Sequence, residues 1–263
     1  MKGLKQRAIT ALIFGIIIIG TIILDRYACI GLLALIAGGT ALEYGLVVKK
    51  SHAMLLGLVA ISMVGILVYT DQVYTYWIIV GLTIITMTIL ASYVFRSIND
   101  LNHGRWAYWV AAFYFGSSMG LFAREMKIVE DYSYYFIGVL VLIWLSDSGA
   151  YMVGSQWGRR KLMPKISPNK TVEGFLGSLA AVLIGGYVLS KLTPVETTDW
   201  WIIVSIVVWL SGTLGDLTQS AVKRQYGVKD TGRLLPGHGG VWDRFDSLLY
   251  VAPAVALVDR FLI

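Results

Sequence analysis

The chain has 263 residues, of which 57% are hydrophobic and only 14% are charged, and its mean hydropathy is +0.69. An ordinary soluble domain carries about 25% charged residues, so this composition excludes a soluble globular protein and indicates an integral membrane protein. The single cysteine, Cys29, excludes an internal disulfide and a cysteine-based metal cluster.

Long apolar runs follow one another along the whole chain. Each is close to the length of about 20 residues that a membrane-spanning helix needs. We therefore predict an all-α fold, a polytopic transmembrane helical bundle of about nine spans, as one domain over residues 1–263. The runs cover residues 8–24, 27–48, 53–69, 77–95, 106–122, 134–155, 174–192, 201–222 and 247–262. The first run resembles a signal peptide, but no small-x-small cleavage pattern follows it, so we expect it to remain as a span.

The basic residues predict how these spans are oriented, because short cytoplasmic loops collect Lys and Arg. With a cytoplasmic N-terminus, 17 of the 22 basic residues lie in predicted cytoplasmic segments. The other side holds Arg26, Arg124, Lys127, Lys191 and Arg260. The net charge of +6 is thus explained by loops beside anionic lipid headgroups, and we expect no nucleic-acid partner.

The first part of the chain, residues 1–105, is aliphatic, and we assign it to packing, lipid contact or assembly. Glu43 is the exception, because it is an acid inside the second apolar run. A snorkelling or helix-capping role and a functional role are equally compatible with its position. Farther on, we interpret residues 123–133 as a solvated connector whose charges have no further role.

The second part, residues 106–263, holds acids inside spans or at their cytoplasmic ends, and we predict that it is catalytic. Asp147 lies in the sixth run and Asp216 in the eighth. A polar stripe at helical spacing surrounds the latter: Gly212, Asp216, Ser220, Lys223 and Arg224. Asp243 and Asp246 are three residues apart and share a face if the last helix begins near Val241.

Acids near hydrocarbon need partners, because a carboxylate at the membrane centre costs about 2.5–3.5 kcal/mol on insertion scales. A ligand set made of oxygens favours a hard cation such as Mg²⁺, which completes its shell with water and substrate phosphates. Structural ion pairs, such as Lys223 with Asp230, are the alternative. They explain any one pair but explain the whole set poorly.

Two segments are suited to phosphates. The glycine-rich turn at 237–240 turns backbone N–H groups and the His238 side chain toward an anion, although a plain turn is the alternative. The segment 167–171, SPNKT, opens the seventh helix. There Asn169 or Thr171 is a candidate cap, and Lys170 is placed to meet an anionic ligand.

These segments contain the motifs of a known family. Residues 220–246 read S-x-x-K-R-x-x-x-x-K-D-x-G-x-x-x-P-G-H-G-G-x-x-D-R-x-D, which resembles the signature of the bacterial phosphatidate cytidylyltransferases, or CDP-diacylglycerol synthases. The motifs D-S-G-A-Y at 147–151 and S-P-N-K-T-x-E-G at 167–174 are similar to two further family motifs and stand in the expected order. The specific part of the resemblance covers about residues 140–255.

The resemblance implies a magnesium-dependent enzyme of phospholipid biosynthesis. Such an enzyme joins CTP and phosphatidic acid into CDP-diacylglycerol and pyrophosphate. It also implies a potassium ion beside the magnesium, a homodimer in the lipid bilayer, and a multi-pass protein of the bacterial inner membrane whose active site opens to the cytoplasm.

Residue roles follow from the resemblance and the charge pattern. The predicted catalytic residues are Asp216, Asp243, Lys223 and Arg224. The implied metal ligands are Asp216 and Asp243, with Asp246 and Asp147 as further ligands. The predicted substrate-binding residues are Lys170, Ser167, Asn169, Ser220, Lys229, Asp230, Gly237, His238, Gly239, Gly240 and Arg244. Arg244 either holds the lipid phosphate or orients Asp243.

Two other functions remain open at this point. A CTP-dependent lipid kinase for a polyprenol or phytol would transfer the γ-phosphoryl group and release CDP instead of pyrophosphate. The alternative that is not an enzyme is an ion-coupled transporter, since intramembrane acids also mark ion paths. A transporter predicts acids spread across the bilayer and often repeated halves, neither of which the sequence shows.

Overall fold

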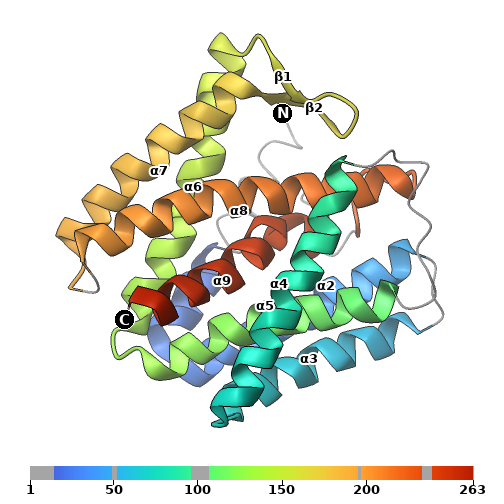
Figure 1. Cartoon of the computed structure of the whole chain (residues 1–263), viewed down its shortest axis with the longest axis vertical. Coiled ribbons are helices and arrows are strands. Elements are labelled where there is room, and N and C mark those ends of the chain that lie inside the picture. Colours follow the sequence, from blue (N-terminus) through green and yellow to red (C-terminus); the bar gives the residue numbers. More distant parts are fainter. Residues whose placement is uncertain (1–14, 49–51, 96–106, 195–196, 233–238, 263) are drawn as a thin grey trace.

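The computed structural model describes residues 15–48, 52–95, 107–194, 197–232 and 239–262, and it confirms the all-α bundle (Figure 1). A short apolar helix, Gly15–Leu24, comes first. The other elements are α2 Arg26–Val47, α3 Ala53–Tyr69, α4 Val73–Phe95, α5 Ala107–Ile128, α6 Tyr132–Trp157, β1 Lys161–Met163, β2 Ser167–Thr171, α7 Val172–Leu192, α8 Thr198–Gln225 and α9 Trp242–Leu262. Within the described residues, each predicted apolar run thus falls on a helix.

Five of these helices are long and apolar enough to cross a membrane: Arg26–Val47, Val73–Ser92, Tyr132–Trp157, Val172–Leu192 and Thr198–Gln225. Their outward faces are apolar. On α7, for example, Leu176, Ile184 and Leu192 are 55%, 66% and 72% exposed. Large exposed aliphatic side chains of this kind are stable against lipid and costly against water. The count of about nine spans and their orientation stay predictions.

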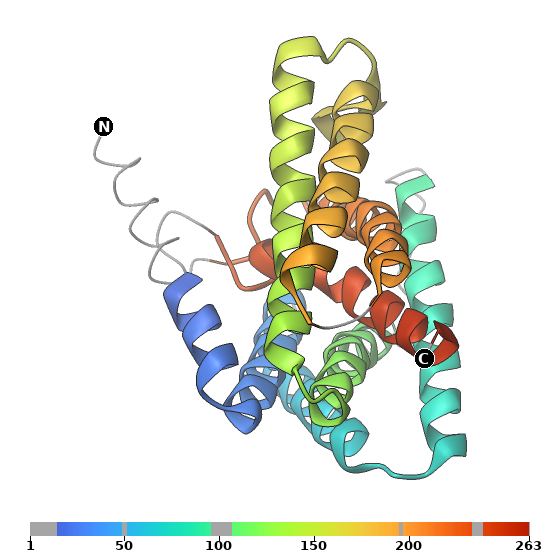
Figure 2. The same ribbon diagram turned by 90° about the vertical axis from the view of Figure 1, so that its left-hand side faces the viewer.

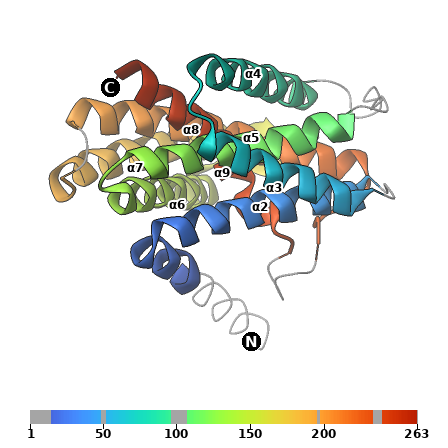
Figure 3. The same cartoon turned by 90° about the horizontal axis from the view of Figure 1, so that it is seen from below.

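Helices α8 and α9 join two groups of helices. Helices α6 and α7 lie side by side and carry the β1–β2 hairpin at one end (Figures 1 and 2). Helices α2, α3 and α5 form a second group. Helix α9 contacts α8 as well as α5, α2 and α4, and the view from below shows it among these helices (Figure 3). The start and the body of α9 are therefore held from several sides.

Aromatic packing fixes the start of α9 against the second group. The Trp242 ring lies edge-on to those of Tyr44 and Phe115, with centroids 5.6 and 5.5 Å apart, and all three side chains are buried. Farther along, the Tyr114 hydroxyl donates a hydrogen bond of 2.9 Å to the Leu249 carbonyl. Such buried edge-to-face pairs add stability beyond the area they bury.

The basic residues predicted to lie outside gather where helix ends meet. Arg26 donates to the carbonyls of Lys127 and Glu130 at 3.0 and 3.2 Å. Lys127 in turn donates to the carbonyl of Val68 at the end of α3. Arg260, at the end of α9, pairs with Glu125 at 3.4 Å. Basic side chains near a helix C-terminus satisfy its free carbonyls, so these contacts join the helix ends on this side.

The prediction of a solvated connector over residues 123–133 is wrong. Helix α5 continues to Ile128, and Glu125 and Met126 are buried. Arg124 donates to the carbonyl of Leu67 at 3.4 Å and also to that of Thr70. The charged residues are accommodated because neighbouring helix ends supply partners, and hydrophobicity along the sequence does not show this.

Helices α7 and α8 approach closely at Gly186. A methyl group at this position would lie only 2.8 Å from the Trp201 carbonyl oxygen and would also overlap the Ser205 hydroxyl. Only a glycine fits there without displacing α8.

Gly186→Ala is therefore expected to destabilise the protein, since overpacking of this kind costs about 1–3 kcal/mol. The midpoint of thermal unfolding of the protein in detergent measures the effect. Gly81→Ala on α4 is the matched control, because no atom lies within 4 Å of its added methyl group and alanine favours a helix over glycine. Equal losses in both variants would contradict the close packing of α7 on α8.

Candidate active site

A β-hairpin carries Lys170 to the site. Strand β1 pairs antiparallel with β2, with Lys161 opposite Thr171. Thr171 ends β2 and is also the N-cap of α7, because its side chain accepts from the Gly174 amide at 3.1 Å. Of the two candidate caps, Thr171 is thus the one used. The helical prediction did not include the hairpin, because strands of this length carry too little periodicity to be recognised.

Glu173 fastens this hairpin to the first turn of α7. Its carboxylate accepts the backbone amides of Arg159 and Arg160 at 3.0 and 3.1 Å. These amides follow the end of α6, so one side chain connects α6, the hairpin and α7. The strand that carries Lys170 is therefore held in place by hydrogen bonds to its neighbours.

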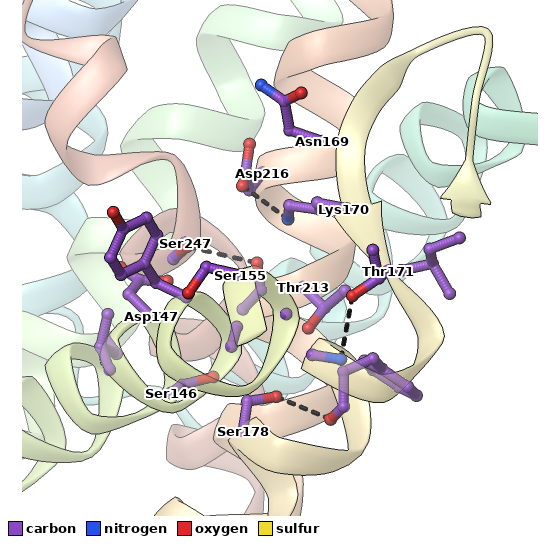
Figure 4. Close-up of a pocket in the computed structure, with 18 of the residues that line it drawn as sticks. Ser146, Asp147, Ser155, Asn169, Lys170, Thr171, Ser178, Thr213, Asp216 and Ser247 are labelled. Atoms are coloured by element: carbon purple, nitrogen blue, oxygen red, sulfur yellow. Dashed lines mark hydrogen bonds and ion pairs between the residues drawn. The ribbon is translucent and has the colours of Figure 1, made fainter. Parts of the chain in front are cut away.

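Lys170 meets the acid of the predicted polar stripe on α8. Its ammonium lies 2.5 Å from Asp216 Oδ2, and a dashed line joins the two side chains in Figure 4. Ser220, one turn further along α8, donates to Asp216 Oδ1 at 3.2 Å. The structure thus brings together two predicted segments that are 46 positions apart in the printed sequence.

Asp243 lies in the first turn of α9, and five donors surround its carboxylate. Lys223 and Gln219 donate to Oδ1 at 2.8 and 3.3 Å. The Thr231 amide, the Thr231 hydroxyl and the Gly240 amide donate to Oδ2 at 2.8, 3.0 and 3.0 Å. Because α9 begins at Trp242, the expected helix start near Val241 is confirmed. Asp243 thus holds the backbone that leads into this helix and offsets the charge of Lys223.

Two cavities meet at a shared acidic wall. The first, of about 460 Å³, lies between α6, α7, α8 and the hairpin, and apolar side chains such as Ile143, Phe175 and Val208 line much of it. The second, of about 320 Å³, is lined by Asp147, Asp216, Gln219, Lys223, Asp230, Asp243, Arg244, Asp246 and Ser247. Both share Asp147, Asp216 and Ser247. An apolar chamber and a charged chamber therefore open onto the same carboxylates.

Gly215 makes this junction possible. A methyl group on it would lie 2.5 Å from the Asp246 carbonyl oxygen of α9. Without a side chain at this position, α8 and α9 touch backbone to backbone. Asp216 and Asp246 are thereby placed on the walls of one cavity.

All four predicted metal ligands line the second cavity. Within the described ranges, no group of three or more Asp, Glu, His or Cys residues has the arrangement of a metal site made of protein ligands alone. Mg²⁺ usually takes one or two carboxylates and completes its shell with water and substrate phosphates, so this donor set fits that ion in the presence of an anionic substrate. At Asp243, a metal would have to displace Lys223 or Gln219 from Oδ1.

The other predicted site residues divide into two sets. Asn169 lines the first cavity, and Asp230 and Arg244 line the second. By contrast, Arg224 donates to the Ile166 carbonyl in the hairpin at 3.4 Å. The remaining residues outside both linings are Ser167, Lys229 and Ser220, the last of which reaches the site through Asp216.

The glycine-rich turn is described only in part. Gly237 and His238 lie outside the described residues. Gly239 has a φ of +85°, as a turn of this kind requires. The Gly240 amide donates a hydrogen bond to Asp243, so this part of the turn is bound to the first turn of α9. A role for it in binding phosphate stays a prediction.

Sequence reasoning did not include Gln219, Thr231 and Ser247 among the site residues. Gln219 and Thr231 hold Asp243, and Ser247 lies on the wall shared by the two cavities. Single uncharged polar residues give no signal of their own in such a chain. The neighbours of Asp243 and Asp246 at helical spacing would have pointed to some of them.

Sequence comparisons agree with the geometry. A profile described as the cytidylyltransferase family matches residues 5–262. A Bacillus subtilis (strain 168) protein named phosphatidate cytidylyltransferase is 34% identical over 262 residues, which is 96% of each chain. Proteins of the same name from Staphylococcus saprophyticus and Staphylococcus aureus (strain COL) are 40% and 38% identical over 174 residues, which is 65% of this chain and 67% of theirs.

Glu173→Gln is expected to loosen the hairpin, because the neutral amide is a weaker acceptor for the amides of Arg159 and Arg160. Trypsin cuts after basic residues, so cleavage at 159–161 should become severalfold faster in the folded protein. Glu130→Gln is the control, since that side chain is exposed on the loop after α5. Unchanged cleavage in Glu173→Gln would show that this carboxylate does not hold the hairpin.

Proposed function

Because the chain belongs to the cytidylyltransferase family, we propose that it transfers the cytidylyl group of CTP to phosphatidic acid, giving CDP-diacylglycerol and pyrophosphate. The relatives named phosphatidate cytidylyltransferase support this reaction. The observation that carries the proposal is the pair of cavities that meet at Asp147 and Asp216. A reaction between a lipid and a nucleotide needs both an apolar and a polar chamber at one reacting centre.

The two substrates are assigned to the chambers by their chemistry. The acyl chains of phosphatidic acid suit the first cavity, where Ile143, Leu162 and Phe175 supply apolar walls. The triphosphate suits the second cavity, which Lys223 and Arg244 line. The lipid phosphate and the α-phosphate of CTP then meet at the shared wall. This places the reacting atoms beside Asp147, Asp216 and Ser247.

The proposed reaction is an in-line displacement. A phosphatidate oxygen attacks the α-phosphorus of CTP, a new P–O bond forms, and the bond to the β-phosphate oxygen breaks with its electron pair leaving on pyrophosphate. The nucleophile is already anionic, so the reaction needs no strong general base. The protein has to position two anions that repel each other and to offset their charge.

Lys170 and Lys223 are suited to this task because each ends beside a carboxylate at the reacting centre. Lys170 is held by Asp216 and Lys223 by Asp243. When anionic substrates enter, each ammonium has an alternative partner, and the freed carboxylates become available to a cation. The pairs therefore offset the charges of Asp216 and Asp243 before the substrates bind and keep both lysines at the site.

We also propose Mg²⁺ as the cation. Asp216 and Asp243 would hold it, with Asp246 and Asp147 as further candidates, and its charge when bound would stabilise the α-phosphate and the departing pyrophosphate. The cluster of four acids on one cavity wall supports this assignment. A potassium ion and a homodimer rest on the sequence resemblance alone and stay predictions.

The charge distribution supports a site that opens to the cytoplasm of the bacterial inner membrane. The hairpin, the end of α8 and the start of α9 form the site, and their loops contain 10 of the 22 basic residues. The basic residues predicted to lie outside gather at the opposite helix ends, around Glu125 and Arg260. This two-sided pattern is what the positive-inside rule predicts.

The purified protein in detergent, given labelled CTP, phosphatidic acid and Mg²⁺, is expected to release pyrophosphate and form a labelled CDP-lipid. Release of CDP with a phosphorylated lipid alcohol would instead identify a lipid kinase.

Asp216→Asn should lower kcat by about 100-fold, because Lys170 and the cation lose their carboxylate. Gln156→Asn, on an exposed residue of α6, is the control for handling and folding. Full activity of Asp216→Asn would remove this residue from the mechanism.

Ser155→Trp tests the lipid chamber, because Ser155 lines the first cavity and a large ring would fill part of it (Figure 4). An overpacking cost of about 1–3 kcal/mol predicts a rise in the KM for phosphatidic acid of at least about fivefold, with the KM for CTP unchanged. Gln156→Trp adds the same ring to the next residue, which is exposed and not part of the lining. If both variants raise the KM for CTP equally, the chambers are assigned wrongly.

A further inference from the structure

Glu43 is a buried acid far from the catalytic residues in sequence but not in space. It lies on α2, is 6% exposed, and its carboxylate receives the backbone amides of Val241 and Trp242 at 2.8 and 3.0 Å. The Val241 contact spans 198 positions of the chain. These amides belong to the N-terminal end of α9, which has no intrahelical acceptors for them. Glu43 therefore caps α9 from another helix. Of the roles that the sequence left open for it, helix capping is confirmed.

Thr231 links this cap to the active site. Its hydroxyl lies 2.9 Å from Glu43 Oε2 and 3.0 Å from Asp243 Oδ2, and its amide donates to Asp243 at 2.8 Å. A hydroxyl has one proton, so the two carboxylates share one donor. The Thr231 side chain thus connects Glu43 directly to Asp243. Thr231 is 7% exposed, so water has little room to replace it.

Two glycines leave space for Glu43. A methyl group on Gly232 would lie 2.5 Å from Glu43 Oε1, and one on Gly240 would lie 2.5 Å from the same oxygen. The absence of side chains at both positions lets the backbone at Gly232 and at Gly240 lie close to the carboxylate. At least part of the glycine-rich turn is therefore shaped to receive Glu43, a role separate from binding phosphate.

We infer that Glu43 is a positioning residue of the active site, which holds Asp243 and the start of α9 in place through Thr231 and the amides of Val241 and Trp242. The inference rests on the proposed function for its kinetic part and on geometry for its structural part. The sequence assigns the N-terminal spans to packing, lipid contact or assembly. The inference gives one of these spans, α2, a part in positioning the active site. Helix α2 fixes the site without touching the substrates.

Glu43→Gln is the sharpest test, because it keeps the shape and removes the charge. The glutamine oxygen can serve one of the two backbone amides, while its NH₂ group would face the other donors. Loss of a group that orients a metal-facing ligand typically lowers affinity or activity by about 10- to 100-fold. We expect kcat to fall within that range and the half-saturating Mg²⁺ concentration to rise. The KM for phosphatidic acid should change little, because Glu43 does not line the first cavity.

Variants at Thr231 separate positioning from general instability. Thr231→Val loses the shared hydroxyl and should reproduce the effect of Glu43→Gln on Mg²⁺ dependence, whereas Thr231→Ser keeps the hydroxyl and should restore it. Glu125→Gln is the matched control. Glu125 is equally buried but pairs with Arg260 at the opposite helix ends. It should lower the unfolding midpoint without moving the Mg²⁺ dependence.

A measurement without turnover keeps the structural part testable by itself. Amide hydrogen exchange should become faster over residues 228–245 in Glu43→Gln and stay unchanged there in Glu125→Gln. If the wild-type protein forms no CDP-lipid, the proposed function fails, and this exchange result still decides whether Glu43 holds the loop. Unchanged exchange, or a loss of activity that only follows the loss of folded protein with the Mg²⁺ dependence unmoved, would overturn the inference.

Discussion

The rest of the structure depends on how four carboxylates from α6, α8 and α9 are kept together around one cavity. Carboxylates that face one cavity repel each other, and the repulsion grows as the surroundings become less polar. The fold offsets it with cations and donors fixed by separate elements: Lys170 from the hairpin, Lys223 from α8, and the amides of the turn before α9. Each element that enters the bundle there adds one compensating group, so packing and electrostatics are satisfied by the same arrangement.

This arrangement also explains why the site has two kinds of support. Residues that face the cavities, such as Asp216, have partners that substrates and a cation can replace. Residues behind them, such as Glu43 and Glu173, bind backbone amides that have no other acceptor. The first set is suited to change partners during a reaction. Glu43 above all is suited to remain fixed, because it is buried and breaking a buried hydrogen bond to a charged group leaves both partners without compensation.

Close backbone contact is the other requirement of the site. Gly186 brings α8 to α7, and Gly215 brings α9 to α8. In a bilayer, helices gain little from burying apolar surface against each other, so small residues that permit close packing contribute much of their association. The Gly215 contact also brings Asp216 of α8 and Asp246 of α9 to the wall of one cavity. At this position the same close packing serves both the bundle and the site.

The sequence by itself determined the membrane class, the position of every described helix, the family and the segments that form the site. Apolar length, helical spacing of Gly212 to Arg224 and the motif at 220–246 are local signals, and local signals can be read along the chain. Only the tertiary structure decided that Lys170 pairs with Asp216, that Arg224 turns to the hairpin, that Glu125 and Met126 are buried and that Glu43 caps α9. Each of these depends on a partner contributed by another helix or loop. No local pattern encodes such a partner, because its position is set only when the helices pack.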